Sequence, residues 1–141
     1  MIFAVAFWIG IGLAALYILV ARQSEKVERI VGAGLLISVG FWYLGFGVFN
    51  GAGFKTLLPQ LLGGVFFAIL GYLGLTRSLF FPGIGWMMHA TWDFSSPHFS
   101  DVSYMPDWAA PMCLGFDVLI GVYLLARSQS LVSEGAPKPF G

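Results

Sequence analysis

Apolar segments separated by short polar stretches follow one another along most of the chain. They cover residues 2–21, 28–49, 56–75 and 109–127, and the charged stretch RQSEKVER separates the first two. Each segment is close to or above the roughly 20 apolar residues that a helix needs to cross the hydrocarbon core of a bilayer. The pattern therefore predicts at least four transmembrane helices.

A further apolar segment, over residues 79–94, is shorter, and Pro82-Gly83 interrupts its start. If it crosses the membrane, six of the seven Lys and Arg residues lie on one face and Lys55 stands alone on the other; if it does not, the division is four to three. Loops on the cytoplasmic side carry an excess of positive charge. We therefore predict five transmembrane helices, with the N-terminus outside and the C-terminus in the cytoplasm.

The fold expected from this pattern is an all-α, polytopic membrane helix bundle. Residues 1–128 form a single transmembrane domain, and residues 129–141 form a polar tail rich in turn-forming residues. The run over 2–21 is too long for the apolar part of a signal peptide, and no basic residue precedes it. It is therefore expected to remain as the first membrane span.

Composition agrees with a multi-pass membrane protein whose surroundings are the lipid bilayer. Hydrophobic residues make up 58% of the 141 residues and charged residues only 10%, against about 25% charged residues in a typical soluble domain. The formal net charge is zero and no basic patch is present, which argues against nucleic-acid binding. The single cysteine excludes an intrachain disulfide.

The candidate chemistry is concentrated between Pro82 and Asp117. This stretch carries both histidines, the only cysteine, four of the seven acidic residues and three of the five tryptophans. His89 and Asp93 are four residues apart, so they share one face of a helix. Asp117 lies about 12 Å into the last helix, at a depth similar to that of His89. Ionisable residues inside a membrane are costly, by about 2.5–3.5 kcal/mol, and commonly mark functional sites.

These residues support several kinds of site. The candidate catalytic residues are His89, Asp93 and Asp117. The candidate metal ligands, which offer the nitrogen and oxygen atoms that zinc accepts, are His89, Asp93, His98 and Asp117. The residues expected to line a pocket for a cofactor are Trp86, Trp92 and Cys113. A single intramembrane histidine also suits a haem or a chlorophyll-type pigment, and the same polar residues can instead form a structural lock between two helices.

Three functions follow from these alternatives. The first is an accessory subunit or small-ligand binder, working as a homo-oligomer or within a larger membrane complex. The second is a membrane-embedded enzyme acting on a lipid or other hydrophobic substrate, with His89 as general base held by Asp93, and Asp117 assisting or binding metal. The third is a proton-coupled carrier with Asp117 as the titrating group; it would be an oligomer, because the chain shows no inverted repeat.

Four sequence features between residues 77 and 127 carry a resemblance: GIGWMMHATWD, Pro97-His98, the region from Pro106 to Pro111, and the run CLGFD. Together they resemble an uncharacterised family of small bacterial and fungal integral membrane proteins. The positions that match the family pattern are His89, Trp92, Asp93, His98, Cys113 and Asp117. The resemblance implies a multi-pass protein, here of a bacterial inner membrane, with no assigned activity; where relatives carry paired histidines, this chain has Pro97-His98.

A second, partial resemblance is to the membrane hydrolases that include alkaline ceramidases and adiponectin receptors. His89 and Asp93 match the HxxxD motif of that superfamily. The chain has no HxxxH motif and fewer predicted helices than those enzymes.

Overall fold

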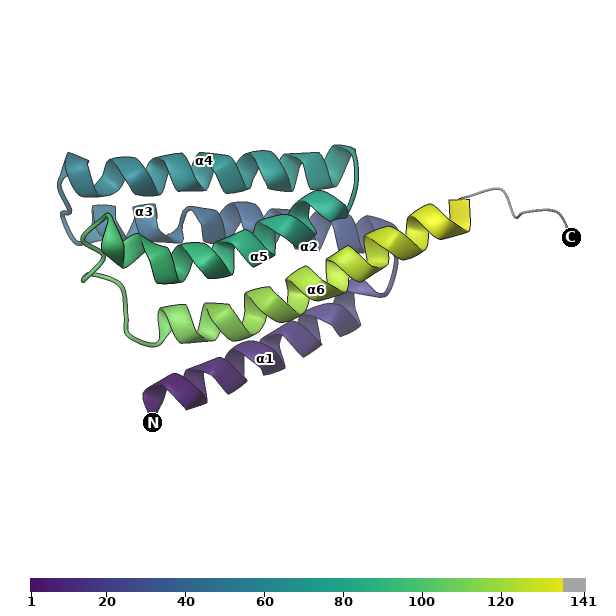
Figure 1. The fold of residues 1–141 in the computed structure, drawn as a ribbon, viewed down its shortest axis with the longest axis horizontal. Helices are drawn as coiled ribbons and strands as arrows, with labels where there is room; N and C mark the ends of the chain where they lie inside the picture. Colours follow the sequence, from purple (N-terminus) through teal and green to yellow (C-terminus); the bar gives the residue numbers. More distant parts are fainter. Residues whose placement is uncertain (136–141) are drawn as a thin grey trace, which may run out of the picture.

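A computed structural model of the protein describes residues 1–135, and within this range the regular structure is entirely helical (Figure 1). The elements are α1 (Ile2–Ala21), α2 (Glu25–Gly40), α3 (Trp42–Phe49), α4 (Phe54–Thr76), α5 (Phe80–Ser95), the 3-10 turn η1 (Ser96–His98) and α6 (Ala109–Gly135). Helices α2 and α3 continue one another as a single rod. Each of the five predicted apolar segments is therefore a helical rod, and the predicted all-α bundle is confirmed.

The rods pack with α5 in the middle of the bundle. Helix α1 lies along α6 on one side, and α4 lies along α2 and α3 on the other (Figure 1). Four rods, namely α1, α2–α3, α4 and α6, are long and apolar enough to cross a membrane. The chain is thus a multi-pass membrane protein by length and composition, while α5, with 16 residues, spans only about 24 Å.

The two ends of the bundle differ in chemistry. The connections after α1 and α4 lie at one end, which we call the charged end because it carries Arg22, Lys26, Arg29 and Arg77. The connections over residues 50–53 and 99–108 lie at the opposite end, which we call the loop end. This arrangement has the charge asymmetry that the sequence predicted, and the side of the membrane on which each end lies stays a prediction.

Helix α2 begins three residues earlier than the sequence analysis predicted. The Ser24 hydroxyl accepts a hydrogen bond from the Val27 N–H at 3.2 Å, which caps the helix. Glu25 and Glu28 lie in the first turn, where negative charge is favourable near the positive end of the helix dipole. Most of the stretch read as a charged loop is therefore helical.

The rod formed by α2 and α3 is interrupted at Phe41, a break that the sequence analysis did not predict. Phe41 has φ −97° and ψ 1°, outside the helical range of its neighbours. At this point Gly40 packs on Phe67 of α4, where a Cβ atom would lie only 2.8 Å from the Phe67 Cβ. The break therefore coincides with the close approach of two rods through a glycine.

Helix α6 is longer than predicted: it ends at Gly135 rather than near residue 127. The Ser128, Ser130 and Ser133 hydroxyls donate to backbone carbonyls of the preceding turn, so these polar residues continue the helix instead of ending it. These last turns extend past the other rods (Figure 1). The predicted polar tail is thus helical over 129–135, and residues 136–141 lie outside the described part of the chain.

Candidate functional site

Three polar side chains meet in the middle of the bundle, and we call them the central cluster: His89 and Asp93 from α5 and Asp117 from α6. They are 1%, 2% and 0% exposed. The His89 Nδ1 lies 2.8 Å from the Asp117 Oδ2 and 3.9 Å from the Asp93 Oδ2. One potential ligand atom from each residue lies within 4.8 Å of the others. The structure therefore brings together the three residues that the sequence proposed as catalytic.

Backbone contacts through glycines hold α5 and α6 close enough for this meeting. A Cβ atom on Gly83 of α5 would lie 3.1 Å from the Leu125 nitrogen of α6, and one on Gly121 of α6 would lie 3.1 Å from the Gly83 carbonyl oxygen. Small residues of this kind let helix backbones approach closely within a membrane. The i, i+4 spacing then points His89 and Asp93 toward Asp117.

Aromatic rings enclose the imidazole of His89. Phe67 and Trp86 meet it edge to face, with ring centroids 5.0 and 6.3 Å away. The Trp86 indole is itself fixed, because its Nε1–H donates to the Gly32 carbonyl oxygen at 3.1 Å. The Val39 carbonyl, just before the break between α2 and α3, also lies beside the imidazole. Packing on all sides leaves His89 little freedom to move.

Asp93 differs from Asp117 because it has no close contact with His89 and no cationic partner at hydrogen-bonding distance. Its nearest donors are the neutral Tyr43 hydroxyl and the neutral Cys113 thiol, and neither Asp93 oxygen, nor Oδ1 of Asp117, has a hydrogen bond of full geometry within residues 1–135. A buried carboxylate without a cationic partner is energetically costly. The central cluster therefore offers more acceptor atoms than the protein itself satisfies.

A small cavity, which we call the lateral crevice, reaches the central cluster from the side of the bundle. It has a volume of about 150 Å³. Its lining comes from three rods, and the residues are Leu13, Leu35, Val39, Trp42, Met112, Cys113, Phe116 and Asp117. The outer residues Leu13 and Leu35 are exposed, whereas Asp117 is fully buried. The crevice thus opens at the lipid-facing surface, and its wall beside the buried Asp117 is apolar.

The other residues that the sequence proposed lie at different distances from the cluster. Trp86 and Cys113 are adjacent to it. The Trp92 Nε1–H donates to the Gln60 Oε1 at 3.3 Å instead, outside the imidazole contacts. His98 is exposed in η1 and does not belong to the group of potential ligands. The predicted set of four metal ligands is therefore reduced to three.

A loop covers the loop end of the bundle above the cluster. The Ser100 hydroxyl donates to the Thr56 carbonyl at 3.1 Å, which ties this loop to α4. Hydrogen bonds from Ser103 hold the pKa of the exposed Asp101 carboxyl below its usual range. Burial, followed by the nearby Asp101 charge, raises the pKa of the Tyr104 hydroxyl. The hydrogen bond from Ser100 thus ties the beginning of this loop to the bundle.

A second buried charge lies at the charged end, and the sequence analysis missed it. Glu28 is 1% exposed, and its two carboxylate oxygens accept from the Arg127 Nε at 3.2 and 3.4 Å. The Arg22 guanidinium lies 6.0 Å from the centre of the Tyr123 ring. The sequence analysis placed Glu28 at the overlap of the charged stretch RQSEKVER and the predicted helix over 28–49, but it did not predict that the side chain is buried and paired with Arg127.

An apolar layer separates the central cluster from the charged end. Leu36, Trp86 and Ile120 are each 0% exposed and belong to the same hydrophobic core. Asp117 and Arg127 are ten residues apart on α6, which corresponds to about 15 Å along the axis. The central cluster and the pair formed by Glu28 and Arg127 are therefore separated by apolar core.

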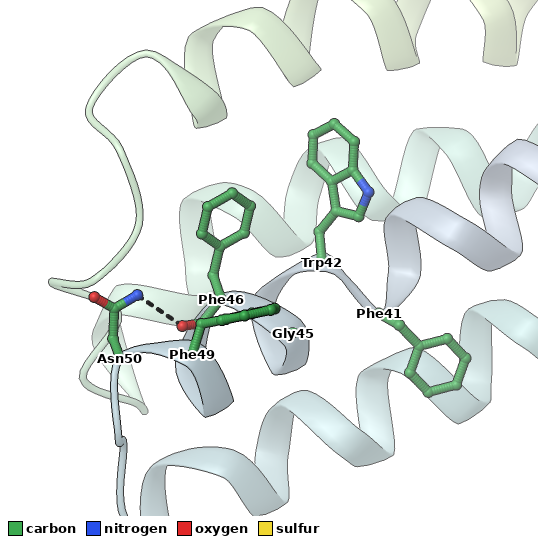
Figure 2. A pocket seen from close by; sticks show the side chains of 6 residues that line it. All are labelled: Phe41, Trp42, Gly45, Phe46, Phe49 and Asn50. Atoms are coloured by element: carbon green, nitrogen blue, oxygen red, sulfur yellow. Dashed lines mark hydrogen bonds between the residues drawn. The ribbon is translucent and has the colours of Figure 1, made fainter.

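The outer surface of α3 carries a further apolar groove of about 400 Å³, which borders on the crevice through Trp42. Figure 2 shows Trp42 and Phe46 projecting to one side of α3 and Phe41 to the other, with Gly45 between them. The Asn50 side chain donates to the Phe46 carbonyl at 2.8 Å at the end of this groove (Figure 2). The groove leads along α3 from the loop end to the mouth of the crevice.

Comparison with known proteins identifies one family. The model of the family described as "Family of unknown function (DUF6010)" matches residues 3–130, which include every residue of the central cluster. No curated protein and no solved structure matches the chain. The partial resemblance to ceramidases and adiponectin receptors therefore gains no support from the comparisons.

Proposed function

The chain belongs to this family of unknown function, and from that premise we propose that it is a membrane-embedded small-ligand binder whose ligand is a divalent transition-metal ion. The metal would be held by His89 Nδ1 and by one oxygen each of Asp93 and Asp117. This proposal makes the central cluster a binding site rather than a lock between helices.

The observation that carries the proposal is the Asp93 carboxylate, which is 2% exposed, has only the neutral donors Tyr43 and Cys113 beside it, and lies 3.9 Å from the His89 Nδ1. A structural lock needs only the hydrogen bond between His89 and Asp117. It gives no reason for a second buried carboxylate, whose charge costs about 2.5–3.5 kcal/mol at the centre of a helix within a membrane. A divalent cation removes that cost, because two carboxylates and a neutral imidazole balance its charge.

The geometry of the cluster fits such an ion. Zinc binds histidine nitrogen and carboxylate oxygen at about 2.0–2.2 Å, so the ligand atoms of a tetrahedral site lie about 3.3 Å apart. The distances from His89 Nδ1 to the two carboxylates, 2.8 and 3.9 Å, lie on either side of that value, and the three ligand atoms lie within 4.8 Å of one another. Because the His89 imidazole is packed on all sides, the two carboxylates would move to bring these distances together. Three protein ligands leave the fourth position for another molecule, as in catalytic zinc sites.

The test is the metal content of the purified full-length protein, with Asp93→Asn beside the wild type. Asp107→Asn, at an exposed loop aspartate, is the matched control. After incubation with Zn²⁺, Mn²⁺ or Fe²⁺ and removal of excess metal, elemental analysis should find about one ion per chain in the wild type and the control, and about a tenth or less in Asp93→Asn, as expected for loss of a ligand.

Thermal unfolding of the same samples gives a second readout. Added metal should raise the unfolding temperature of the wild type, because a ligand at 100 times its dissociation constant stabilises the folded state by about 2.7 kcal/mol. Asp93→Asn should show no such increase. A wild type that takes up none of the three metals, and whose unfolding does not respond to them, contradicts the proposed function.

A further inference from the structure

We propose that a polar cavity at the charged end binds the phosphodiester group of an anionic membrane phospholipid. This cavity, which we call the charged cavity, has a volume of about 310 Å³ and lies where the connection between α1 and α2 meets α6. Its lining residues are Ala21, Arg22, Ser24, Glu25, Glu28 and Arg127. The site is separate from the proposed metal site, because the apolar layer lies between the charged cavity and the central cluster.

Two guanidinium groups line the charged cavity from different elements. Arg22 follows the last residue of α1, and Arg127 belongs to α6. The planar guanidinium fork matches the oxygen atoms of a phosphate group and can bind it through two parallel hydrogen bonds. A phosphate in the charged cavity can therefore accept hydrogen bonds from both elements at once.

Both arginines keep hydrogen-bond donors for a ligand. Within residues 1–135, Arg127 donates only from its Nε, to the two Glu28 oxygens at 3.2 and 3.4 Å, so its two Nη groups remain available. The Arg22 guanidinium makes no ion pair with a carboxylate of the described chain, and it lies 6.0 Å from the centre of the Tyr123 ring. An anion between these arginines therefore gains hydrogen bonds without breaking those that the fold already has.

The carboxylates in the lining are already balanced by arginines. Glu28 pairs with Arg127, and the Glu25 Oε1 accepts from Arg29 at 2.8 and 2.9 Å. Arg22 is then the one cation of the lining without a carboxylate partner among residues 1–135. A phosphodiester carries a single negative charge and balances this cation, whereas a phosphate monoester carries about −1.5 to −2.

The surroundings of the charged cavity favour an anionic lipid over a zwitterionic one. Within the described chain, this end carries five basic residues and three acidic ones, namely Arg22, Lys26, Arg29, Arg77 and Arg127 against Glu25, Glu28 and Glu134. Basic pockets between transmembrane helices on the cytoplasmic side are typical sites for anionic lipid headgroups, and the charged end is predicted to face that side. The added positive charge of a choline group is unfavourable in this field, and a glycerol headgroup avoids it.

An apolar groove on the same pair of helices can hold the acyl chain. A cavity of about 370 Å³ lies between α1 and α6, and its lining includes Phe7 and Ile11 of α1 and Val118 and Val122 of α6. Arg22 follows Ile11 by eleven residues, which is about three helical turns, so the two share one face of α1 about 16 Å apart. This length is about half the thickness of the hydrocarbon core. A headgroup in the charged cavity therefore places its acyl chain along this groove, toward the middle of the bilayer.

The test measures the lipid that the purified full-length protein retains, by native mass spectrometry. The protein in detergent is mixed with equal amounts of dioleoylphosphatidylglycerol and dioleoylphosphatidylcholine, which share their acyl chains and differ in headgroup charge. The wild type should retain about one phosphatidylglycerol per chain, with about tenfold higher affinity than for phosphatidylcholine, as expected beside several basic residues. Equal retention of the two lipids overturns the inference.

A matched pair of variants ties the retention to the charged cavity. Arg22→Gln removes the unpaired cation of the lining and should lower the affinity for phosphatidylglycerol about tenfold, which corresponds to the loss of a charge-assisted hydrogen bond. Arg77→Gln removes the same charge at the same end, from an exposed residue outside the lining, and should lower the affinity no more than about twofold, because salt screens exposed charges. Equal losses in the two variants would indicate attraction to the whole charged end and would overturn the site.

Thermal unfolding gives a second readout and distinguishes a lipid from free phosphate. Phosphatidylglycerol should raise the unfolding temperature of the wild type and of Asp93→Asn, but not that of Arg22→Gln, because only a bound ligand stabilises the folded state. Inorganic phosphate should leave all three unchanged; an increase that Arg22→Gln abolishes would assign the charged cavity to a soluble phosphate and overturn the lipid site. Because Asp93→Asn lacks a ligand of the proposed metal site and keeps the charged cavity, the two proposals can fail independently.

Discussion

At the scale of single residues, Asp93 and Asp117 show how two similar carboxylates acquire different roles. Asp117 accepts a hydrogen bond from His89 at 2.8 Å, whereas Asp93 lies 3.9 Å from the same nitrogen. The first is part of a direct side-chain contact between α5 and α6. The second is a buried carboxylate without a cationic partner at hydrogen-bonding distance, and such groups are kept where function requires them rather than where stability does.

This difference predicts opposite effects of two substitutions on the metal-free protein. Asp93→Asn removes an unpaired buried charge and should raise the free energy of unfolding by about 1–3 kcal/mol. His89→Ala leaves two buried carboxylates without their cation or donor and should lower it by about 3–5 kcal/mol. Denaturation of the detergent-solubilised variants in the presence of a chelator measures both values.

Equal effects of the two substitutions would contradict this prediction. If Asp93→Asn destabilises the protein as much as His89→Ala does, Asp93 takes part in a structural lock. The metal site would then lose the observation on which it was proposed.

At the scale of elements, glycines determine which helices meet. Gly10 of α1 packs directly on the Met112 carbonyl of α6, and Gly115 of α6 packs on the Phe7 carbonyl of α1. Reciprocal contacts of this kind bring the two backbones together without any polar side chain between them. Because Leu13 of α1 lines the lateral crevice, the same contacts also fix one of its walls.

Two glycines of α1 therefore respond differently to the same substitution. Gly10→Ala forces α1 away from α6 and should lower the free energy of unfolding by about 1–3 kcal/mol, the usual cost of overpacking. Gly12 has no neighbouring atom within 4 Å of an added Cβ, so Gly12→Ala should change stability by no more than about 0.5 kcal/mol. Denaturation in detergent measures both, and equal effects would contradict close packing at Gly10.

The sequence was sufficient for the apolar rods but not for their interruptions. Hydrophobic length predicts a helix without regard to its neighbours, so the residues of α1 and α4 were placed within two residues of the observed bounds. The break at Phe41 depends on the approach of α4 to Gly40, which no local pattern contains. The i, i+4 spacing placed His89 beside Asp93, but it could not show that His98 lies outside the cluster, because the turn η1 sets that position.

At the scale of the whole molecule, charge separates the two ends of the bundle. The described basic residues gather at the charged end, and Lys55, in the first turn of α4, lies at the loop end. The positive-inside rule predicts that the charged end faces the cytoplasm. The central cluster would then lie in the outer half of the membrane, beneath the loop over residues 99–108.

Labelling of single added cysteines tests this orientation, because the native Cys113 is buried. Lys55→Cys should react with a membrane-impermeant maleimide in intact cells, and Lys26→Cys should react only after the cells are opened; both side chains are exposed in the bundle. The reverse pattern would place the loop end in the cytoplasm and would contradict the orientation predicted from charge.

The apolar layer formed by Leu36, Trp86 and Ile120 has an electrical consequence. A cation bound at the central cluster as proposed, entering from the loop end, would cross about 12 Å of the roughly 30 Å of hydrocarbon and therefore about 0.4 of the transmembrane voltage. For a divalent ion, each 100 mV would then change the binding free energy by about 1.8 kcal/mol, or about twentyfold in affinity. If the loop end lies outside, as predicted, a membrane with a negative interior would strengthen binding, and depolarisation would weaken it.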